Sequence, residues 1–88
     1  MQGVVYMGIE EIFAKNVRLY RDRLGLTQEE LAERCFQIEE DALANRSYIS
    51  DIENCRRNIT LEKIGNLAKA LEVQPYQLFV TKDTDEKL

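Results

Sequence analysis

Histidine is absent from this chain, and cysteine occurs only twice, at Cys35 and Cys55. The common zinc sites need closely spaced cysteine and histidine ligands, so the sequence predicts no metal site. A glycine-rich phosphate loop is missing too, and no serine or cysteine has a recognisable general base beside it. These absences argue against an enzyme and against a cofactor. Two isolated cysteines are best interpreted as reduced thiols.

Long apolar runs are also missing. No segment approaches the ~20 apolar residues that a membrane helix needs, and Val4 to Met7 are too few for the core of a signal peptide. We therefore expect a cytoplasmic protein without membrane contact. The 44% hydrophobic and 32% charged residues are typical of a globular chain. Its 88 residues predict one domain with one modest core.

Helical spacing of apolar residues dominates the pattern, and we find no strand pattern, internal repeat or low-complexity linker. The first helix runs from Ile9 to about Leu24, with Gly25 as its natural stop. Residues 27–30, Thr-Gln-Glu-Glu, have the pattern of a capping box that opens a second helix. The apolar stripe of this second helix is expected at Leu31, Cys35, Ile38 and Ala42.

Three further helices complete the prediction of an all-α fold with five helices. Asn45 is a good N-cap for a third helix over about 46–54, and Thr60 is one for a fourth. Pro75 starts a short fifth helix at the position where proline is permitted. The residues of the fourth helix expected to face the core are Leu61, Ile64, Leu67, Ala68 and Leu71. An N-terminal arm (1–8) and a flexible charged tail (81–88) flank the helical domain (9–80).

The third predicted helix has an unusual polar side. Its large apolar residues are Tyr48, Ile49 and Ile52, while its other positions carry small, amide, hydroxyl or charged side chains. A helix that only shields a core usually carries Lys and Glu outward, because short polar side chains are mediocre helix formers. Compact donors and acceptors suit a helix that enters the DNA major groove and contacts base edges.

The net charge of −4 argues weakly against nucleic acid, because phosphate contact favours a basic surface. The distribution matters more than the sum. Basic residues gather early in the chain and around the third helix, whereas acidic residues gather at 39–41 and in the tail. Such a dipolar surface is compatible with one basic binding face.

Four segments in order carry a family resemblance: GLTQEELAE (25–33), NRSYISDIE (45–53), RRNITLEKI (56–64) and LAKALEVQPYQLF (67–79). Over about residues 12–79 the chain resembles the XRE-type, phage-repressor-like helix-turn-helix regulators. It is most similar to the controller proteins of restriction–modification operons. The resemblance implies a sequence-specific transcriptional regulator that binds a palindromic operator in double-stranded DNA as a homodimer. The sequence gives no sign of a small-molecule effector.

The resemblance also implies a DNA-contacting set. Arg46 and Ser47 would contact bases from the first turn of the recognition helix, and Arg can bind guanine O6 and N7 together. Tyr48 would lie against the sugar–phosphate backbone or a thymine methyl, or else be half-buried in the core. Gln28 would bind a phosphate or buttress the recognition helix. The full set is Thr27, Gln28, Asn45, Arg46, Ser47, Tyr48, Ser50, Asp51, Asn54, Arg56, Arg57 and Asn58.

Charged residues near the end of the third helix have predicted roles as well. Asp51 repels phosphate, but it can accept from cytosine N4, and more often such an Asp rejects wrong bases or pairs with a nearby Arg. Glu53 matches a family position that often pairs with an Arg of its own domain, and Arg18 is a candidate. The segment 56–58, Arg-Arg-Asn, would grip phosphate and position the protein without reading sequence.

Two features depart from the family pattern. Nine residues, 36–44, separate Cys35 from Asn45, where the family pattern implies a link shorter by about seven residues, or two helical turns. We expect an extension of the second helix, with a bulged loop containing a short helix as the alternative. Cys55 occupies a turn position where glycine is frequent, which indicates a strained or left-handed backbone there.

Assembly and a second function complete the interpretation. The end of the chain has more apolar bulk than a short terminal helix needs, and Phe79 is expected to pack inward. The predicted dimer interface contains Leu71, Val73, Tyr76, Leu78 and Val80. The alternative function is an antitoxin or protein-binding adaptor built on the same fold, favoured by the negative net charge and the acidic segment 39–41.

Overall fold

The chain folds into a small bundle of helices in a computed structural model that describes residues 7–40 and 45–81. Within these ranges lie α1 (Ile9–Arg23), α2 (Gln28–Ile38), α3 (Arg46–Glu53), α4 (Leu61–Leu71) and the 3-10 helix η1 (Pro75–Phe79), with no strand. The predicted all-α class is therefore confirmed. The fifth predicted helix is a 3-10 helix, a form that is common in such short pieces.

Local signals position the helix ends as predicted. Gly25 has φ +68° in the turn after α1, and the Leu26 N–H donates to the Arg21 carbonyl at 3.0 Å. The capping box at Thr27 and Glu30 is complete in both directions. Asn45 accepts from the Tyr48 N–H at 2.9 Å at the start of α3. Helices α2 and α3 therefore begin with part of their unpaired backbone satisfied.

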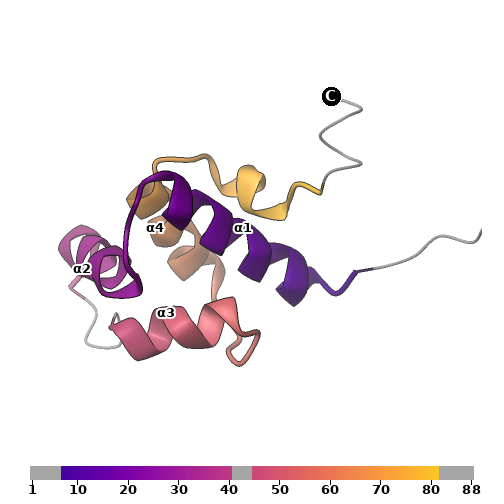
Figure 1. The fold of residues 1–88 in the computed structure, drawn as a ribbon, viewed down its shortest axis with the longest axis horizontal. Coiled ribbons are helices and arrows are strands. Elements are labelled where there is room, and N and C mark those ends of the chain that lie inside the picture. The colour runs from indigo at the N-terminus through magenta and orange to yellow at the C-terminus, as the bar shows by residue number, and fades with distance from the viewer. Residues whose placement is uncertain (1–6, 41–44, 82–88) are drawn as a thin grey trace, which may run out of the picture.

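One core lies between the helices. Figure 1 shows α1 running across the molecule, with α3 along one side and η1 along the other. α1 packs on α3, α4 and η1, and α2 packs on α3 and α4. The largest side chains that are fully buried are Leu31, Ile49, Leu67, Leu71, Leu78 and Val17. Helix α3 is thus held from two directions.

The 3-10 helix is tied to α1 by two kinds of contact. The Asn16 side-chain amide donates to the carbonyls of Leu78 at 2.9 Å and Val80 at 3.0 Å. The rings of Phe13 and Phe79 stack with their centroids 5.3 Å apart, so the expected inward packing of Phe79 is confirmed. This end of the chain is therefore anchored by hydrogen bonds as well as apolar contact.

The predicted inward position of Leu61 is wrong, because this side chain is 86% exposed in the first turn of α4. Ile9, at the first turn of α1, is 62% exposed in the same way. Both residues belong to apolar stripes that are buried further along their helices. Periodicity identifies the face of a helix, but it does not show where the neighbouring helices end.

The predicted extension of α2 across 36–44 is also wrong. The helix ends at Ile38, and Glu39 has an extended backbone with φ −146° and ψ 114°. Ile38 is 39% exposed, so the apolar stripe does not continue, and Ala42 lies outside the described residues. Just beyond the end of the helix, the Asn66 side chain of α4 donates to the Glu39 carboxylate. The connection to α3 is longer than the family pattern implies, but it is not helical at Glu39 and Glu40.

The predicted arm and tail lie mainly outside the described residues, apart from Met7, Gly8 and Thr81. Among the helices that the structure does describe, none has the length and apolar character to cross a membrane.

We expect Leu67→Ala to lower the free energy of unfolding by about 2–5 kcal/mol, because Leu67 is 1% exposed at the centre of the core and the change leaves a cavity. Urea denaturation at neutral pH measures this loss. The matched control is Leu19→Ala on α1, where the side chain is 42% exposed and the expected loss is under about 1 kcal/mol. Equal losses for the two variants would contradict the described core.

Candidate nucleic-acid interface

Helix α3 has two distinct sides. Ile49 and Ile52 are buried against the core, at 0% and 3% exposure, as the sequence predicts. Arg46 and Ser47 are exposed in its first turn, and Ser50 is half-buried one turn later. Arg46, Ser47 and Ser50 therefore lie on the side of α3 that faces away from the other helices.

The side chains of Arg46 and Ser47 make no hydrogen bond or ion pair with any other residue in 7–40 or 45–81. With Ser50, Asp51 and Arg56 they line a shallow polar hollow on the surface of α3. Donors that are already exposed and unpaired need not break internal bonds before they bind another molecule. This turn is therefore the part of α3 most ready to form new hydrogen bonds.

Tyr48 is buried, with 7% exposure, so the structure agrees with the core alternative for this residue. The Arg57 guanidinium lies over the Tyr48 ring, with its carbon 5.0 Å from the ring centroid. This is a cation–π contact, an electrostatic attraction that holds the guanidinium over the ring. Tyr48 thus supports Arg57, for which a contact with DNA phosphate is predicted.

Asp51 pairs with both arginines that follow α3. Its carboxylate lies 3.2 Å from Arg57 Nη2 and 3.9 Å from Arg56 Nη1. Of the roles predicted for Asp51, pairing with a nearby Arg is therefore the one formed within the chain. Asn54 is engaged inside the helix, because its amide donates to the Ser50 carbonyl at 2.8 Å. Arg56 and Arg57 remain partly open to solvent, with 67% and 38% of their side chains exposed.

The segment after α3 has the unusual backbone that the sequence predicts. Cys55 has φ +59°, a left-handed conformation that is rare for a residue with a Cβ. The Arg56 N–H then donates to the Asp51 carbonyl at 2.8 Å. Through this turn the chain reverses, and it brings Arg56 and Arg57 back beside α3. Asn58 is exposed on the same segment.

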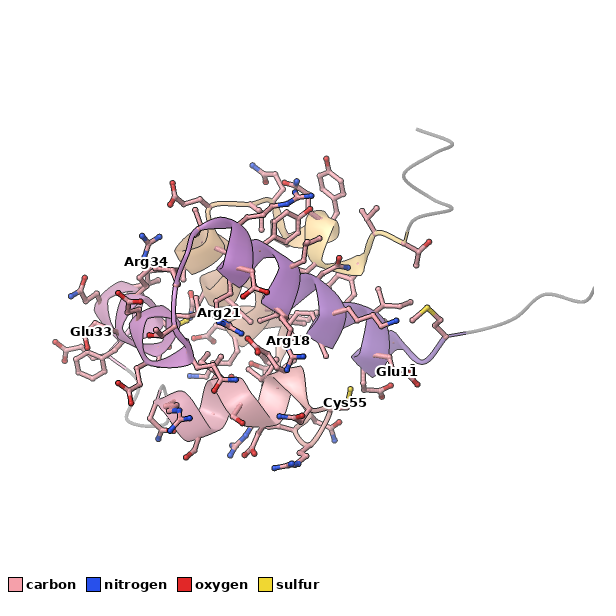
Figure 2. The ribbon with its side chains drawn as sticks, in the orientation of Figure 1. Glu11, Arg18, Arg21, Glu33, Arg34 and Cys55 are labelled. Carbon is pink, nitrogen blue, oxygen red and sulfur yellow. The ribbon has the colours of Figure 1, made fainter. Side chains whose placement is uncertain are left out.

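Glu53 is the buried charge that connects three helices. Its side chain has no exposed area, and its Oε2 lies 2.6 Å from Arg21 Nε. Arg21 Nη2 donates to Oε1 at 3.0 Å, and Gln28 Nε2 donates to the same oxygen at 3.2 Å. Arg18 approaches more loosely at 3.4 Å. Figure 2 shows Arg18 and Arg21 on α1, at the boundary with α3.

The predicted partner Arg18 is confirmed, but Arg21 makes the closer pair and was missed. The two arginines lie three residues apart on α1, a spacing that places both on one face. That spacing was the available signal. Of the two roles expected for Gln28, the buttressing of α3 is the one formed within the chain.

Burial raises the pKa of Glu53, but the hydrogen bonds from Arg21 and Gln28 outweigh burial and hold the pKa below its ordinary value. The carboxylate is therefore charged at neutral pH. Arg21 has the reciprocal shift, since its hydrogen bond to Glu53 raises its pKa. A fully paired charge at this point fixes α3 against α1 and α2, and it leaves the opposite side of α3 unobstructed.

The remaining predicted residues are separated by their burial. Thr27 and Asn45 are exposed helix caps at the starts of α2 and α3. Leu71 and Leu78 are 2% and 0% exposed in the core of the chain itself, so their assignment to a dimer interface is wrong. Tyr76 is 63% exposed beside them. Leu71 and Leu78 were misassigned because the apolar content of a segment does not show whether its residues face the core or an interface.

The sequence is similar to a known domain family and to known proteins. Residues 12–78 match the family model described as a helix-turn-helix domain. The control protein C.SmaI of Serratia marcescens is 43% identical over 68 residues, which are 77% of this chain and 73% of the relative. A hypothetical transcription factor of Neisseria meningitidis is 38% identical over 80 residues, which are 91% of this chain and 69% of the relative.

Two solved structures resemble the fold. That of the hypothetical transcription factor from Neisseria superposes with a TM-score of 0.80 and 32% identity, covering 99% of this chain and 94% of the other. That of the restriction-modification controller protein C.AhdI from Aeromonas hydrophila has a TM-score of 0.69 and 34% identity, covering 80% of this chain and 96% of the other. All of these similar proteins are named as regulators.

We expect Glu53→Gln to lower the free energy of unfolding at pH 7 by roughly 3 kcal/mol, because it leaves Arg21 without its buried counter-charge. The effect should depend on pH. Since the pKa of Glu53 is lowered in the folded state, its stabilisation is present above the unfolded pKa of about 4.3 and is lost as pH falls through the folded pKa.

Urea denaturation from pH 7 to acid measures this dependence. The difference between the wild-type chain and Glu53→Gln should shrink on acidification. Glu33→Gln removes an exposed carboxylate from α2 and serves as the control. A difference that stayed constant across the acid range would show that the Glu53 charge does not stabilise the fold.

Proposed function

This chain belongs to the helix-turn-helix family, and we propose that it is a sequence-specific DNA-binding transcriptional regulator of the controller type, with α3 as its recognition helix. Two of the similar proteins are named as control or controller proteins, which supports the controller type. In a helix-turn-helix the second helix of the motif enters the major groove with its N-terminal residues toward the bases. Here the motif consists of α2 and α3.

The observation that carries the proposal is the pair Arg46 and Ser47. Both side chains are exposed in the first turn of α3, while Ile49 and Ile52 behind them fix the helix to the core. Arg can donate two hydrogen bonds to guanine O6 and N7, and Ser can bond either base type. Arg46 is therefore assigned to base reading, with Ser47 and Ser50 along the same side of the helix.

Phosphate contacts complete the interface. Arg56, Arg57 and Asn58 follow α3 on the chain reversal, and their partly exposed side chains suit the backbone on one flank of the groove. We assign the other flank to the start of α2, where the backbone N–H groups that the capping box leaves unpaired would bind a phosphate while the Gln28 side chain holds Glu53. Such contacts position α3 without reading sequence.

Assembly as a homodimer follows from the size of the interface. One recognition helix reads only a few base pairs, which is too little discrimination against a genome. Two domains related by a two-fold axis would read a palindromic operator with half-sites about one helical turn apart. The surface proposed for pairing is the outer side of η1 and its flanks, where Tyr76 is 63% exposed and Val73 and Val80 are partly exposed.

We expect Arg46→Ala to weaken operator binding by about 1–3 kcal/mol and to relax the preference at one base pair. The operator is first obtained by selecting duplexes from a random pool with the wild-type chain, and binding is then measured by fluorescence anisotropy. Arg23→Ala, which removes an exposed arginine from α1, is the matched control for charge. An equal loss on operator and unrelated DNA would make Arg46 a phosphate contact instead.

We expect sedimentation equilibrium at micromolar concentration to give a dimer for the wild-type chain and a monomer for Tyr76→Asp, because the new charge would be buried between two copies. The control is Leu19→Asp, another exposed apolar position that lies on α1. A wild-type monomer at this concentration, together with a footprint lacking two-fold symmetry, would refute the dimer.

A further inference from the structure

Asp51 is a carboxylate within a surface that would otherwise be basic or neutral. It lies on α3 one turn beyond Ser47, and its side chain is 29% exposed. Its oxygens are 3.2 Å from Arg57 Nη2 and 3.9 Å from Arg56 Nη1. These two arginines are the basic residues that follow the recognition helix. A phosphate that approached these arginines would come from the solvent-exposed side on which Asp51 also lies.

The position of Asp51 is held by the backbone as well as by charge. The Arg56 N–H donates to the Asp51 carbonyl at 2.8 Å, so the turn at Cys55 keeps the arginines beside the carboxylate. Arg57 has a second fixed neighbour, because its guanidinium lies over the Tyr48 ring at 5.0 Å. A ring below and a carboxylate at one edge together restrict the plane and the direction of this guanidinium.

We propose that Asp51 is a specificity-determining residue, which acts as an internal counter-ion that phosphate must displace and which holds Arg57 in a fixed orientation. The proposal rests on the proposed function, since it assumes that α3 and the following arginines face DNA. Asp51 need not contact a base in this role. It lowers the affinity for other DNA more than it lowers the affinity for the correct site.

The two kinds of DNA should respond differently to the Asp51 charge. Non-specific binding depends almost entirely on charge and on the release of counterions. A carboxylate that already neutralises Arg56 and Arg57 therefore weakens it directly. Specific binding also depends on contacts of fixed geometry, and phosphate contacts set the register of the protein on the duplex. On the operator, the orienting effect of Asp51 on Arg57 offsets part of its repulsion.

The test is Asp51→Asn, which removes the charge and keeps the shape of the side chain. Two probes are used: the duplex that the wild-type chain enriches from a random pool, and a duplex of equal length with the same bases in scrambled order. Affinities are measured between about 50 and 200 mM salt, where the salt slope reports the phosphates that are neutralised. Circular dichroism confirms the fold, and Asp51→Ser repeats the test with a smaller side chain.

We expect Asp51→Asn to bind the scrambled duplex about three- to tenfold more tightly, which corresponds to the release of one or two exposed ion pairs. The salt slope on this duplex should steepen by about one. Affinity for the selected duplex should rise less than affinity for the scrambled one, so that the ratio of the two affinities falls.

Two controls separate this effect from a change in net charge. Glu72→Gln also removes a carboxylate paired with an arginine, since Glu72 lies 3.1 Å from Arg34. Figure 2 shows Arg34 on α2, pointing away from α3. This variant should leave the affinity ratio unchanged. In a background of Arg56→Gln and Arg57→Gln, Asp51→Asn should lose most of its effect on the scrambled duplex.

The outcomes distinguish the inference from its premise. A wild-type chain that selects no DNA sequence would refute the proposed function itself. A wild-type chain that selects a sequence, with unchanged affinity of Asp51→Asn for the scrambled duplex, would refute only the counter-ion role. Equal gains for Asp51→Asn and Glu72→Gln would also refute it, because net charge would then explain the effect.

Discussion

The position of α3 depends on the hydrogen bonds and ion pairs of the buried Glu53 carboxylate. This carboxylate comes from the last residue of that helix, and its partners Arg21 and Gln28 come from α1 and α2. An eight-residue helix is too short to be stable alone, so its position must be set by tertiary contacts. Apolar contacts of Ile49 and Ile52 hold α3 to the core, but they are not directional. The charge-assisted hydrogen bonds of Glu53 add the direction.

Because the core-facing side of α3 holds the helix in place, the residues of its outer side are not needed for packing. The exposed first turn carries Arg46 and Ser47, while Tyr48 closes the core beneath Arg57. A single short helix thus combines apolar packing, one buried ion network and an open polar surface. The short polar side chains, which are poor helix formers, are tolerated because stability comes from the other side.

Features that depend on neighbouring residues were predictable from the sequence. The caps at Thr27, Asn45 and Thr60 and the turn at Gly25 are local, and all occur where the pattern indicates. Features that depend on distant contacts were not. The exposure of Leu61, the burial of Leu78 and the end of α2 at Ile38 depend on which helices lie nearby in space.

The residues of the candidate site also differ in whether their roles could be predicted from the sequence. The exposed polar side of α3 follows from residue types in sequence, and the left-handed Cys55 follows from the family pattern, which often has glycine at this turn. The closer partner of Glu53 and the stacking of Arg57 on Tyr48 join segments that only the fold brings together. The family resemblance supplied the positions, and the structure supplied their partners.

The two hydrogen bonds from Asn16 to the segment Leu78–Val80 have a mechanical consequence. Asn16 lies on α1 only two residues before Arg18 and five before Arg21, so one rigid helix joins the η1 segment to the Glu53 network. Through α1, the surface proposed for assembly and the surface proposed for DNA have a constant separation, which is set by α1 together with α3 and η1 packed on either side of it. In the proposed two-fold pair, that separation would set the spacing of the operator half-sites independently of their sequence.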